Sequence, residues 1–198
     1  MPSPYSRKTI AKWSSITDKL ISGHPLKPDE IVTTVLKSWN DIFSSNIGAF
    51  YIGKDIFPTP QIMSFLLHEL VAHYLGLAYP GIYKVGTLKG EKDIHCIDNS
   101  NFSVEIKASS HPSQIFANRS YAQPQLGIGS TTKNGYYITI NFEKFDHVTK
   151  RLPEVTLIRF GYLEHNDWIA QNSATGQQAR LSSEAYRHKL KQIYPKLK

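Results

Sequence analysis

The sequence predicts a single α/β domain in which a mixed central β-sheet is flanked by helices. Apolar residues at helical spacing fill the first third of the chain, and alternating patterns typical of strands fill much of the rest. The 198 residues suffice for one hydrophobic core, and no linker-like stretch divides them. A hydrophobic content of 40% and a charged content of 20% are ordinary for a folded domain.

Two amphipathic helices are expected at the N-terminus. The first covers residues 8–21, where apolar residues recur at helical spacing. Pro28 opens the second, because proline is tolerated in a first helical turn and the two acids that follow it suit the helix dipole. Its apolar face extends to Phe43. Residues 50–57 fit either a short strand or a loop.

A third helix begins at Thr59-Pro60, an N-cap followed by proline at the first helical position, and Gly76 is a plausible C-cap. It is apolar almost all round, which predicts a central buried helix. Glu69 lies inside it, and a buried carboxylate is costly unless it is paired or bound to a metal. Glu69 is therefore either a salt-bridge or edge residue, or a third acid that points at the hairpin described next.

Residues 90–110 are predicted to form a hairpin that carries the candidate catalytic side chains. A strand from Asp93 and a strand over residues 102–108 are joined by the turn-forming residues 98–101. Strand alternation places Glu105 and Lys107 on one face, and the hairpin brings Asp93 beside them. Two carboxylates and an ammonium suit Mg²⁺ and phosphate chemistry. The alternative is a surface hairpin with a simple charge pair.

A polar, turn-rich segment follows the hairpin and ends near Gly135, where the next strand pattern begins. Its length favours a functional loop, although a solvated loop is the alternative. Several of its side chains can bond base edges or phosphates, namely Gln114, Asn118, Arg119, Tyr121, Gln123 and Gln125.

The C-terminal part is predicted to return to strands. Residues 136–142 and 155–163 alternate as strands, and residues 164–167 turn the second of them back into 168–170 as a hairpin. Residues 182–190 can form a short helix. The basic residues from Arg187 onwards are more typical of a solvated face than of a binding surface.

The composition indicates the class of partner and the cellular compartment. The formal net charge of +7 favours an anionic partner, with nucleic acid ahead of a membrane surface. Cys96 is the single cysteine, which excludes an internal disulfide and a Cys-rich zinc site and fits a reducing compartment. Neither a membrane span nor a signal peptide is predicted, so a cytoplasmic protein is expected.

The order Asp93, then Glu105-Ile-Lys107 on an alternating strand, resembles the active-site motif of the PD-(D/E)xK nuclease superfamily. Lys92 stands where that motif has proline. Three longer stretches are similar to small type II restriction endonucleases of the ScaI-like group: EIKASSHPSQIFANRSYAQ, KNGYYITINF and IRFGYLEHNDWIAQNSATGQQARL. The superfamily likeness covers about residues 60–140, and the likeness to the group extends through the C-terminal strands.

The resemblance implies roles for individual residues. Asp93 and Glu105 would be metal ligands, together with the backbone carbonyl of Ile106, and Lys107 would orient or activate the attacking water. Glu69 would help to organise the site. The DNA-binding side chains would come from the segment after the motif, namely Ser109, Ser110, Gln114, Asn118, Arg119, Tyr121 and Gln123.

The resemblance also implies an activity and an organisation. The expected activity is Mg²⁺-dependent, sequence-specific hydrolysis of double-stranded DNA to 5′-phosphate and 3′-hydroxyl ends, by a homodimer whose genetic partner is a DNA methyltransferase. One nuclease domain with a restriction-endonuclease-like core would span residues 1–198, with N-terminal helices in 1–57, the catalytic core in 58–140, and C-terminal strands and a basic helix in 141–198. The alternatives are a structure-specific repair or recombination nuclease of the same superfamily and a non-catalytic basic nucleic-acid-binding module.

Overall fold

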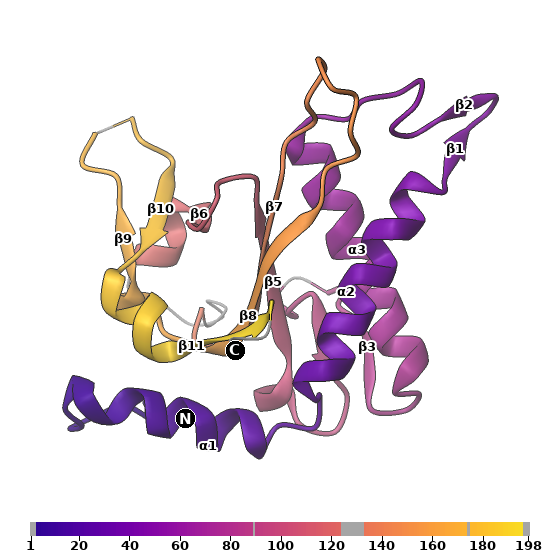
Figure 1. Ribbon diagram of the computed structural model, residues 1–198. Helices are drawn as coiled ribbons and strands as arrows, with labels where there is room; N and C mark the ends of the chain where they lie inside the picture. Colours follow the sequence, from indigo (N-terminus) through magenta and orange to yellow (C-terminus); the bar gives the residue numbers. More distant parts are fainter. Residues whose placement is uncertain (1–2, 89, 124–132, 174, 196–198) are drawn as a thin grey trace.

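A six-stranded mixed sheet forms the centre of the protein in a computed structural model that describes residues 3–88, 90–123, 133–173 and 175–195 (Figure 1). Its strand order is β11-β8-β7-β5-β4-β3. β5 and β7 pair in parallel, and the other neighbouring pairs are antiparallel. The strands are β3 Tyr83–Val85, β4 Ile94–Cys96, β5 Val104–Ser109, β7 Gly135–Phe142, β8 Val155–Leu163 and β11 Leu190–Tyr194. The predicted fold class is confirmed.

Three α-helices precede and cover this sheet: α1 Trp13–Ser22, α2 Pro28–Phe43 and α3 Pro60–Ala78. A short 3₁₀ helix, Ile10–Lys12, leads into α1. The predicted helices are confirmed, although α3 continues past Gly76 and is capped by Tyr79. Between α2 and α3, β1 Asn46–Ile47 and β2 Phe50–Tyr51 form a hairpin, and β2 is the start of the ambiguous segment 50–57.

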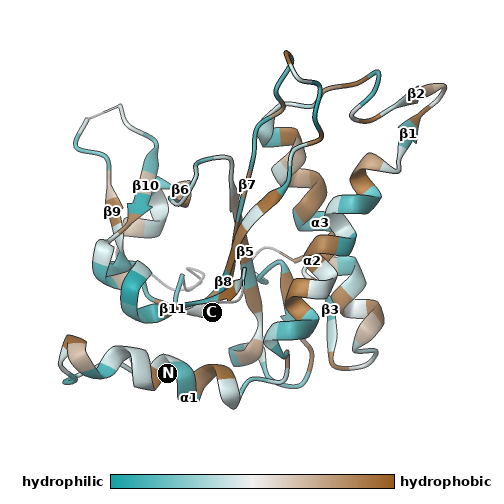
Figure 2. Cartoon of the chain, in the orientation of Figure 1, coloured by the Kyte–Doolittle hydropathy of each residue, from teal (hydrophilic) through white to brown (hydrophobic). Residues whose placement is uncertain are grey.

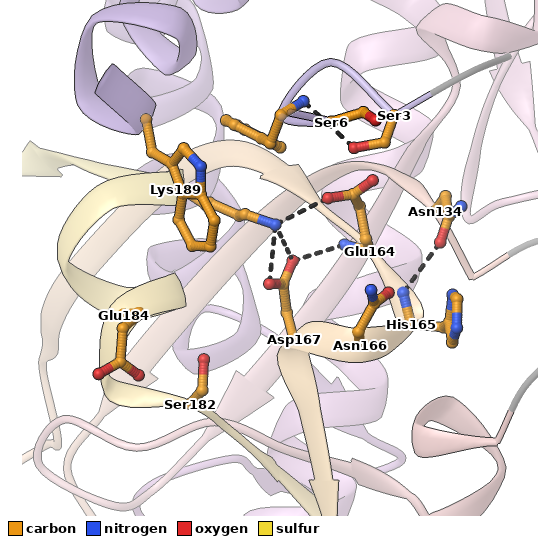
Figure 3. Close-up of a pocket in the computed structure, with 12 residues that line it drawn as sticks. Ser3, Ser6, Asn134, Glu164, His165, Asn166, Asp167, Ser182, Glu184 and Lys189 are labelled. Carbon is orange, nitrogen blue, oxygen red and sulfur yellow. Dashed lines mark hydrogen bonds and ion pairs between the residues drawn. The ribbon is translucent and has the colours of Figure 1, made fainter. Parts of the chain in front are cut away.

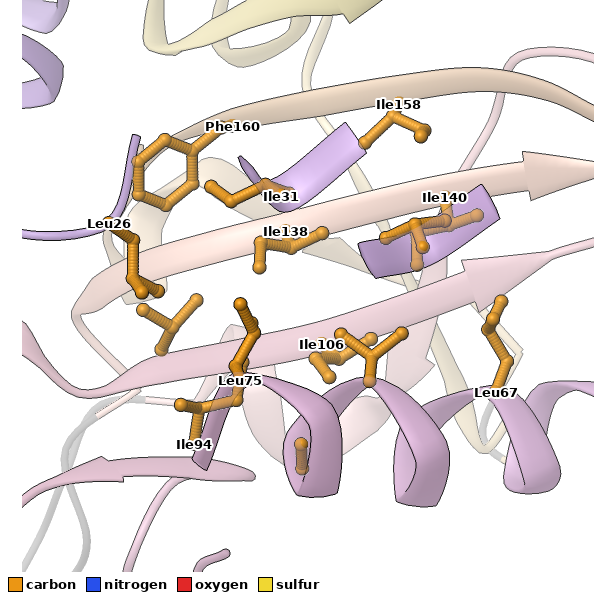
Figure 4. Close-up of a cluster of buried hydrophobic side chains, with 14 of the residues drawn as sticks. Leu26, Ile31, Leu67, Leu75, Ile94, Ile106, Ile138, Ile140, Ile158 and Phe160 are labelled. Carbon is orange, nitrogen blue, oxygen red and sulfur yellow. The ribbon is translucent and has the colours of Figure 1, made fainter. Parts of the chain in front are cut away.

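The main hydrophobic core lies between the sheet and the helices α2 and α3. Figure 4 shows Leu67 and Leu75 of α3 facing Ile106 of β5, with Ile138 of the neighbouring strand beside them. All four side chains are fully buried, at about 1.5–3 kcal/mol of hydrophobic stabilisation each. Figure 2 shows the same segregation by residue type, with hydrophobic colour where the central strands pass the helices. This packing fixes β5 against α3.

The prediction that α3 is buried almost all round is wrong. One face of the helix is exposed and carries Ile62, Phe65, Glu69 and Leu77. The physical reason is that α3 covers the outside of a sheet, so only the face toward the sheet and α2 is enclosed. The apolar residues on its outer face made the sequence look like that of a central helix.

A smaller sheet extends the fold on the other side of β5, in the order β6-β10-β9 (Figure 1). Its strands are β6 Phe116–Asn118, β9 Trp168–Ala170 and β10 Gln178–Leu181. A second hydrophobic cluster, which includes Tyr137 and Trp168, joins it to the large sheet. The predicted hairpin between residues 155–163 and 168–170 is wrong, because the 3₁₀ turn His165–Asp167 carries the chain from one sheet into the other, where β9 pairs with β10.

A buried ion cluster holds that corner together (Figure 3). The Nζ atom of Lys189 lies 2.7 Å from Glu164 Oε2 and 2.8 Å from Asp167 Oδ1. The same ammonium lies 4.3 Å from the ring centroid of Tyr5 and 4.5 Å from that of Trp13. Sequence reasoning placed the basic C-terminal residues on a solvated face, and for Lys189 this is wrong. The predicted helix there is a five-residue π-helix, Ala185–Lys189, followed by β11, which was not predicted.

His24 gives the fold a predictable pH dependence. Its Nδ1 accepts a hydrogen bond from the Leu26 amide and its Nε2 lies 3.1 Å from the carbonyl oxygen of Phe102, which fits a neutral ring protonated at Nε2. Burial lowers the pKa of His24 to about 4. Unfolding restores a pKa of about 6.5, so the unfolded chain binds the extra proton first as the pH falls.

We therefore expect His24 to contribute fully to stability above pH 6.5 and to lose that contribution as the pH falls toward 4. The loss amounts to about 2 kcal/mol between pH 7 and pH 5. Urea unfolding of the wild type and His24→Gln at both pH values measures it. The variant should show a smaller decrease, and equal decreases in the two proteins would contradict the assignment.

Candidate active site

The hairpin of β4 and β5 brings the three predicted site residues together. Ile94 pairs with Val104, so Asp93 at the start of β4 lies beside the middle of β5. The Ile106 amide donates a 2.6 Å hydrogen bond to Asp93 Oδ2. This bond turns one oxygen of Asp93 toward the β5 backbone and fixes the carboxylate against the strand that carries Glu105 and Lys107.

Glu105 and Lys107 form a tight, mostly buried pair on one face of β5. Lys107 Nζ lies 2.6 Å from Glu105 Oε1 and 3.1 Å from the carbonyl oxygen of Ile106. The side chains of Glu105 and Lys107 are only 14% and 15% exposed. The Tyr121 hydroxyl donates to the same Glu105 oxygen at 2.5 Å, and the Lys107 ammonium lies 4.9 Å from the centre of its ring. The predicted proximity of Asp93, Glu105 and Lys107 is thus present in the fold.

The pKa values of the two carboxylates in this cluster are shifted in opposite directions. Burial and the charge of Glu105 raise the pKa of Asp93 to about 6. Burial opposes ionisation of Glu105 too, but Lys107 and Lys92 outweigh it and lower the pKa of Glu105 to about 2. Burial acts to lower the pKa of Lys107, yet Glu105 dominates and raises it above its usual value. At neutral pH the Glu105–Lys107 pair is therefore ionised, and Asp93 would be stabilised by further positive charge.

Lys92, which stands in the place of the motif's proline, packs into this cluster. A Cβ atom on Gly135, where φ is +143°, would lie 2.7 Å from Lys92 Cε, so a side chain at that position would displace the end of the lysine. The ammonium lies 5.0 Å from the ring centroid of Tyr137. Burial lowers the pKa of Lys92, while Glu105 acts to raise it. The departure from the motif thus adds a second lysine that favours ionised Glu105.

The residue that α3 turns toward the site is His68 rather than Glu69. His68 Nδ1 lies 3.9 Å from Asp93 Oδ2, and its buried Nε2 has no hydrogen-bond partner among the described residues. Burial and the charge of Lys107 lower its pKa to about 4, so the ring is neutral at pH 7. Glu69 lies on the exposed face of the helix. The prediction that Glu69 points at the hairpin is therefore wrong, since neighbouring helical residues lie about 100° apart.

A small cavity of about 190 Å³ lies at the cluster and opens beside a hollow of about 660 Å³. Lys107, His68 and Tyr121 line the small cavity, and Asn118 lines both spaces. The hollow is lined from one side by the start of α3 and from the other by the small sheet. Its residues are Pro60, Gln61, Ser64, Ala108, Ser109, Ser110, His111, Pro112, Phe116, Asn118, Lys144 and Gln178.

The predicted DNA-contact residues separate into three groups in the structure. Ser109, Ser110 and Asn118 line the larger hollow, as expected of side chains that could meet a ligand there. Gln114 lines a different hollow, Gln123 is exposed, and Gln125 lies outside the described residues.

Arg119 and Tyr121 are held within the protein. The Arg119 guanidinium donates to the carbonyl oxygens of Ser173 and Gly176, and so ties β6 to the β9–β10 connection. Tyr121 is buried and bonded to Glu105, so it does not lie in a solvated loop, and its DNA contact stays a prediction. Sequence reasoning missed His68, Lys144 and Gln178, because they come from elements whose packing is not local, and it missed His111 although this residue directly follows Ser110.

Comparison with known proteins assigns the chain to a family. The family model for ScaI restriction endonuclease matches residues 3–194. The chain belongs to this family. It is 43% identical over 180 residues to the type II restriction enzyme ScaI of Streptomyces caespitosus, which covers 90% of this chain and 79% of that enzyme. The resemblance to the ScaI-like group is confirmed, and with it the enzyme class of a site-specific deoxyribonuclease.

Proposed function

We propose that this restriction endonuclease hydrolyses double-stranded DNA with Mg²⁺ and leaves 5′-phosphate and 3′-hydroxyl ends. The observation that carries the proposal is the cluster of Asp93, Glu105 and Lys107 on one hairpin, linked by the Asp93–Ile106 and Lys107–Glu105 hydrogen bonds. Lys107 lines a small cavity that shares Ser64 and Asn118 with a hollow large enough to admit a polar ligand, in a protein of net charge +7. Family membership supplies the DNA substrate class.

The donor set fits a hard divalent cation. Asp93 keeps Oδ1 free of its bond to Ile106, and Glu105 keeps Oε2 free of its bonds to Lys107 and Tyr121. The Ile106 carbonyl, which also accepts from Lys107 Nζ at 3.1 Å, would be a third oxygen ligand. Among the described residues no group of three or more His, Cys, Asp or Glu side chains could hold a metal. The two carboxylates suit Mg²⁺, which often takes one or two carboxylates and keeps waters and phosphate oxygens as its other ligands.

The roles of the residues follow from their charge states. A bound Mg²⁺ would polarise the phosphoryl oxygen and make a bound water more acidic. Asp93 and Glu105 would hold the ion. Lys107 is protonated at neutral pH because Glu105 raises its pKa. As an ammonium it would orient the attacking water and stabilise charge on the phosphate.

The DNA would occupy the hollow between α3 and the small sheet. Ser109, Ser110 and Asn118 are the predicted contact residues that line it, and Gln178 pairs directly opposite Asn118 in the sheet. Amide side chains are suited to adenine edges in the major groove. We infer a homodimer acting on a palindrome, since two-fold protein symmetry matches two-fold DNA symmetry, with a DNA methyltransferase as genetic partner.

Digestion of a plasmid in Mg²⁺ tests the proposal. Discrete bands are expected, because a sequence-specific enzyme cuts at fixed positions. A smear, or cleavage of branched or flapped DNA alone, would instead favour a structure-specific repair or recombination nuclease. Absence of cleavage under conditions in which the protein binds DNA would favour a non-catalytic binding module.

Tyr121→Phe should lower the cleavage rate without unfolding the protein. It removes one of the two donors to Glu105 Oε1, and a hydrogen bond to a charged group contributes about 1.5–3 kcal/mol, or about 10- to 100-fold in rate if the bond is needed for catalysis. The ring would still pack against Trp168, at 5.3 Å between centroids. Tyr74→Phe is the matched control, because it removes a hydroxyl bonded to Asp41 away from the site. Equal rates for both variants would contradict a catalytic role.

A further inference from the structure

Three arginines surround a hollow of about 300 Å³ that the proposed chemistry does not use. They are Arg159 of β8, Arg180 of β10 and Arg187 of the π-helix, and so come from three different elements. The other lining residues are Ser113, Gln114, Leu181, Ser183 and Tyr186, and among these described residues there is no acid. Three guanidinium groups around one space, without a carboxylate in its lining, favour an anionic ligand.

Arg159 is fixed in position before any ligand arrives. Its NH1 atom donates to Asn141 Oδ1 at 3.1 Å, its NH2 atom lies 3.4 Å from the carbonyl oxygen of Ser113, and its guanidinium carbon lies 5.2 Å from the ring centroid of Tyr186. These partners are uncharged, so they orient the guanidinium without neutralising it. A held cation loses less side-chain entropy when an anion binds.

Arg180 connects this hollow with the active site. On β10, Ala179 and Leu181 are buried, so alternation places Arg180 on the same outer face of the small sheet as Gln178. Gln178 lines the hollow beside Lys107, and Arg180 lines the arginine hollow. The loop after β5 joins them too, since His111 and Pro112 line the first hollow and Ser113 and Gln114 the second.

We propose that Arg159, Arg180 and Arg187 form a binding site for a backbone phosphate of duplex DNA, a few nucleotides from the phosphate that is cut. This site rests on the proposed function. Two residues along a strand span about 6.7 Å and successive nucleotides rise about 3.4 Å along the duplex, so Gln178 and Arg180 are spaced to meet neighbouring parts of one DNA strand. The anchor would set the register of the DNA on the protein and carry no base information.

The test compares DNA binding in Ca²⁺ by two proteins. The parent is the Lys107→Ala variant, which is expected to bind DNA without cutting it, and the second protein carries Arg180→Gln in addition. The probes are a linear plasmid fragment that contains a cut site mapped with the wild type and a fragment that lacks it. Affinities are measured between about 50 and 200 mM salt, the range over which phosphate contacts show most clearly. Lys19→Gln is the charge-matched control, because Lys19 is an exposed residue of α1 outside both hollows. Arg187→Gln repeats the test at a second exposed position.

We expect Arg180→Gln to weaken binding to both fragments by the same factor and to reduce the slope of log affinity against log salt by about 0.9, the value for one lost phosphate contact. A slope and affinity equal to those of Lys19→Gln would overturn the phosphate site. Loss of affinity for the cut-site fragment alone would overturn it as well, because the arginine would then read bases. If the wild type fails to cut and the parent binds neither fragment, the proposed function itself is overturned.

Discussion

Lys107→Ala should reduce DNA cleavage by about 10²- to 10³-fold while leaving DNA binding measurable in Ca²⁺. The variant removes the ammonium that lies 2.6 Å from Glu105, and with it the group proposed to orient water and stabilise phosphate charge. Asp93 and Glu105 would remain with less positive charge beside them, so binding of a divalent cation should be retained or strengthened. Cleavage of a plasmid, gel-shift binding and calorimetric titration with Mn²⁺ measure the three quantities separately.

Lys84→Ala is the matched control for that experiment. Lys84 of β3 also forms a lysine–glutamate pair, 3.0 Å from Glu91, but its side chain is 44% exposed and lines neither hollow at the site. The control should cut at close to the wild-type rate. Full activity in Lys107→Ala would rule out the proposed mechanism, and loss of both cleavage and metal binding would show that Lys107 supports the fold of the site.

Lys189→Ala should cost about 3–5 kcal/mol of unfolding free energy. The substitution leaves Glu164 and Asp167 buried beside each other without their cation, and the side chains of all three residues are less than 10% exposed. It also removes the ammonium from the rings of Tyr5 and Trp13. For a protein of this size the melting temperature should fall by about 10 °C. Urea unfolding at pH 7 measures the free energy directly.

A triple variant distinguishes two causes of the lost stability: buried carboxylates without a cation, and lost side-chain packing. Lys189→Met with Glu164→Gln and Asp167→Asn removes every charge of the cluster and keeps the side-chain volumes close to those of the wild type. Because a buried ion group can often be replaced as a whole at little cost, the triple variant should recover most of the lost stability. A loss below about 1 kcal/mol in Lys189→Ala itself would contradict the view that this corner depends on the ion cluster.

The sequence was most informative where the relevant contacts are local. The two-residue period of β5 alone places Glu105 and Lys107 on one face. The short connection between β4 and β5 forces the two strands to pair, and this pairing places Asp93 beside them. The helices were equally predictable, because capping residues and apolar spacing are properties of each segment.

Contacts between segments that are distant in the sequence could not be predicted from local sequence patterns. The identity of the α3 residue at the site depends on helix rotation, and a shift of one residue exchanges Glu69 for His68. The strand after the His165–Asp167 turn was predictable. Its pairing with β10 was not, because that pairing depends on side chains that pack together in the second hydrophobic cluster. Lys189 looked like part of a basic tail, since its partners Glu164 and Asp167 lie more than twenty residues away.

The Mg²⁺ dependence of cleavage tests the central claim most directly, namely that the hairpin of Asp93, Glu105 and Lys107 is a metal-dependent centre for DNA hydrolysis. A plasmid is digested by the wild-type protein over a Mg²⁺ titration, with EDTA as the zero point, and the product ends are analysed by ligation. We predict discrete fragments that appear only with the metal and that ligase rejoins, as 5′-phosphate and 3′-hydroxyl ends require. Discrete fragments formed equally well in EDTA would contradict the claim.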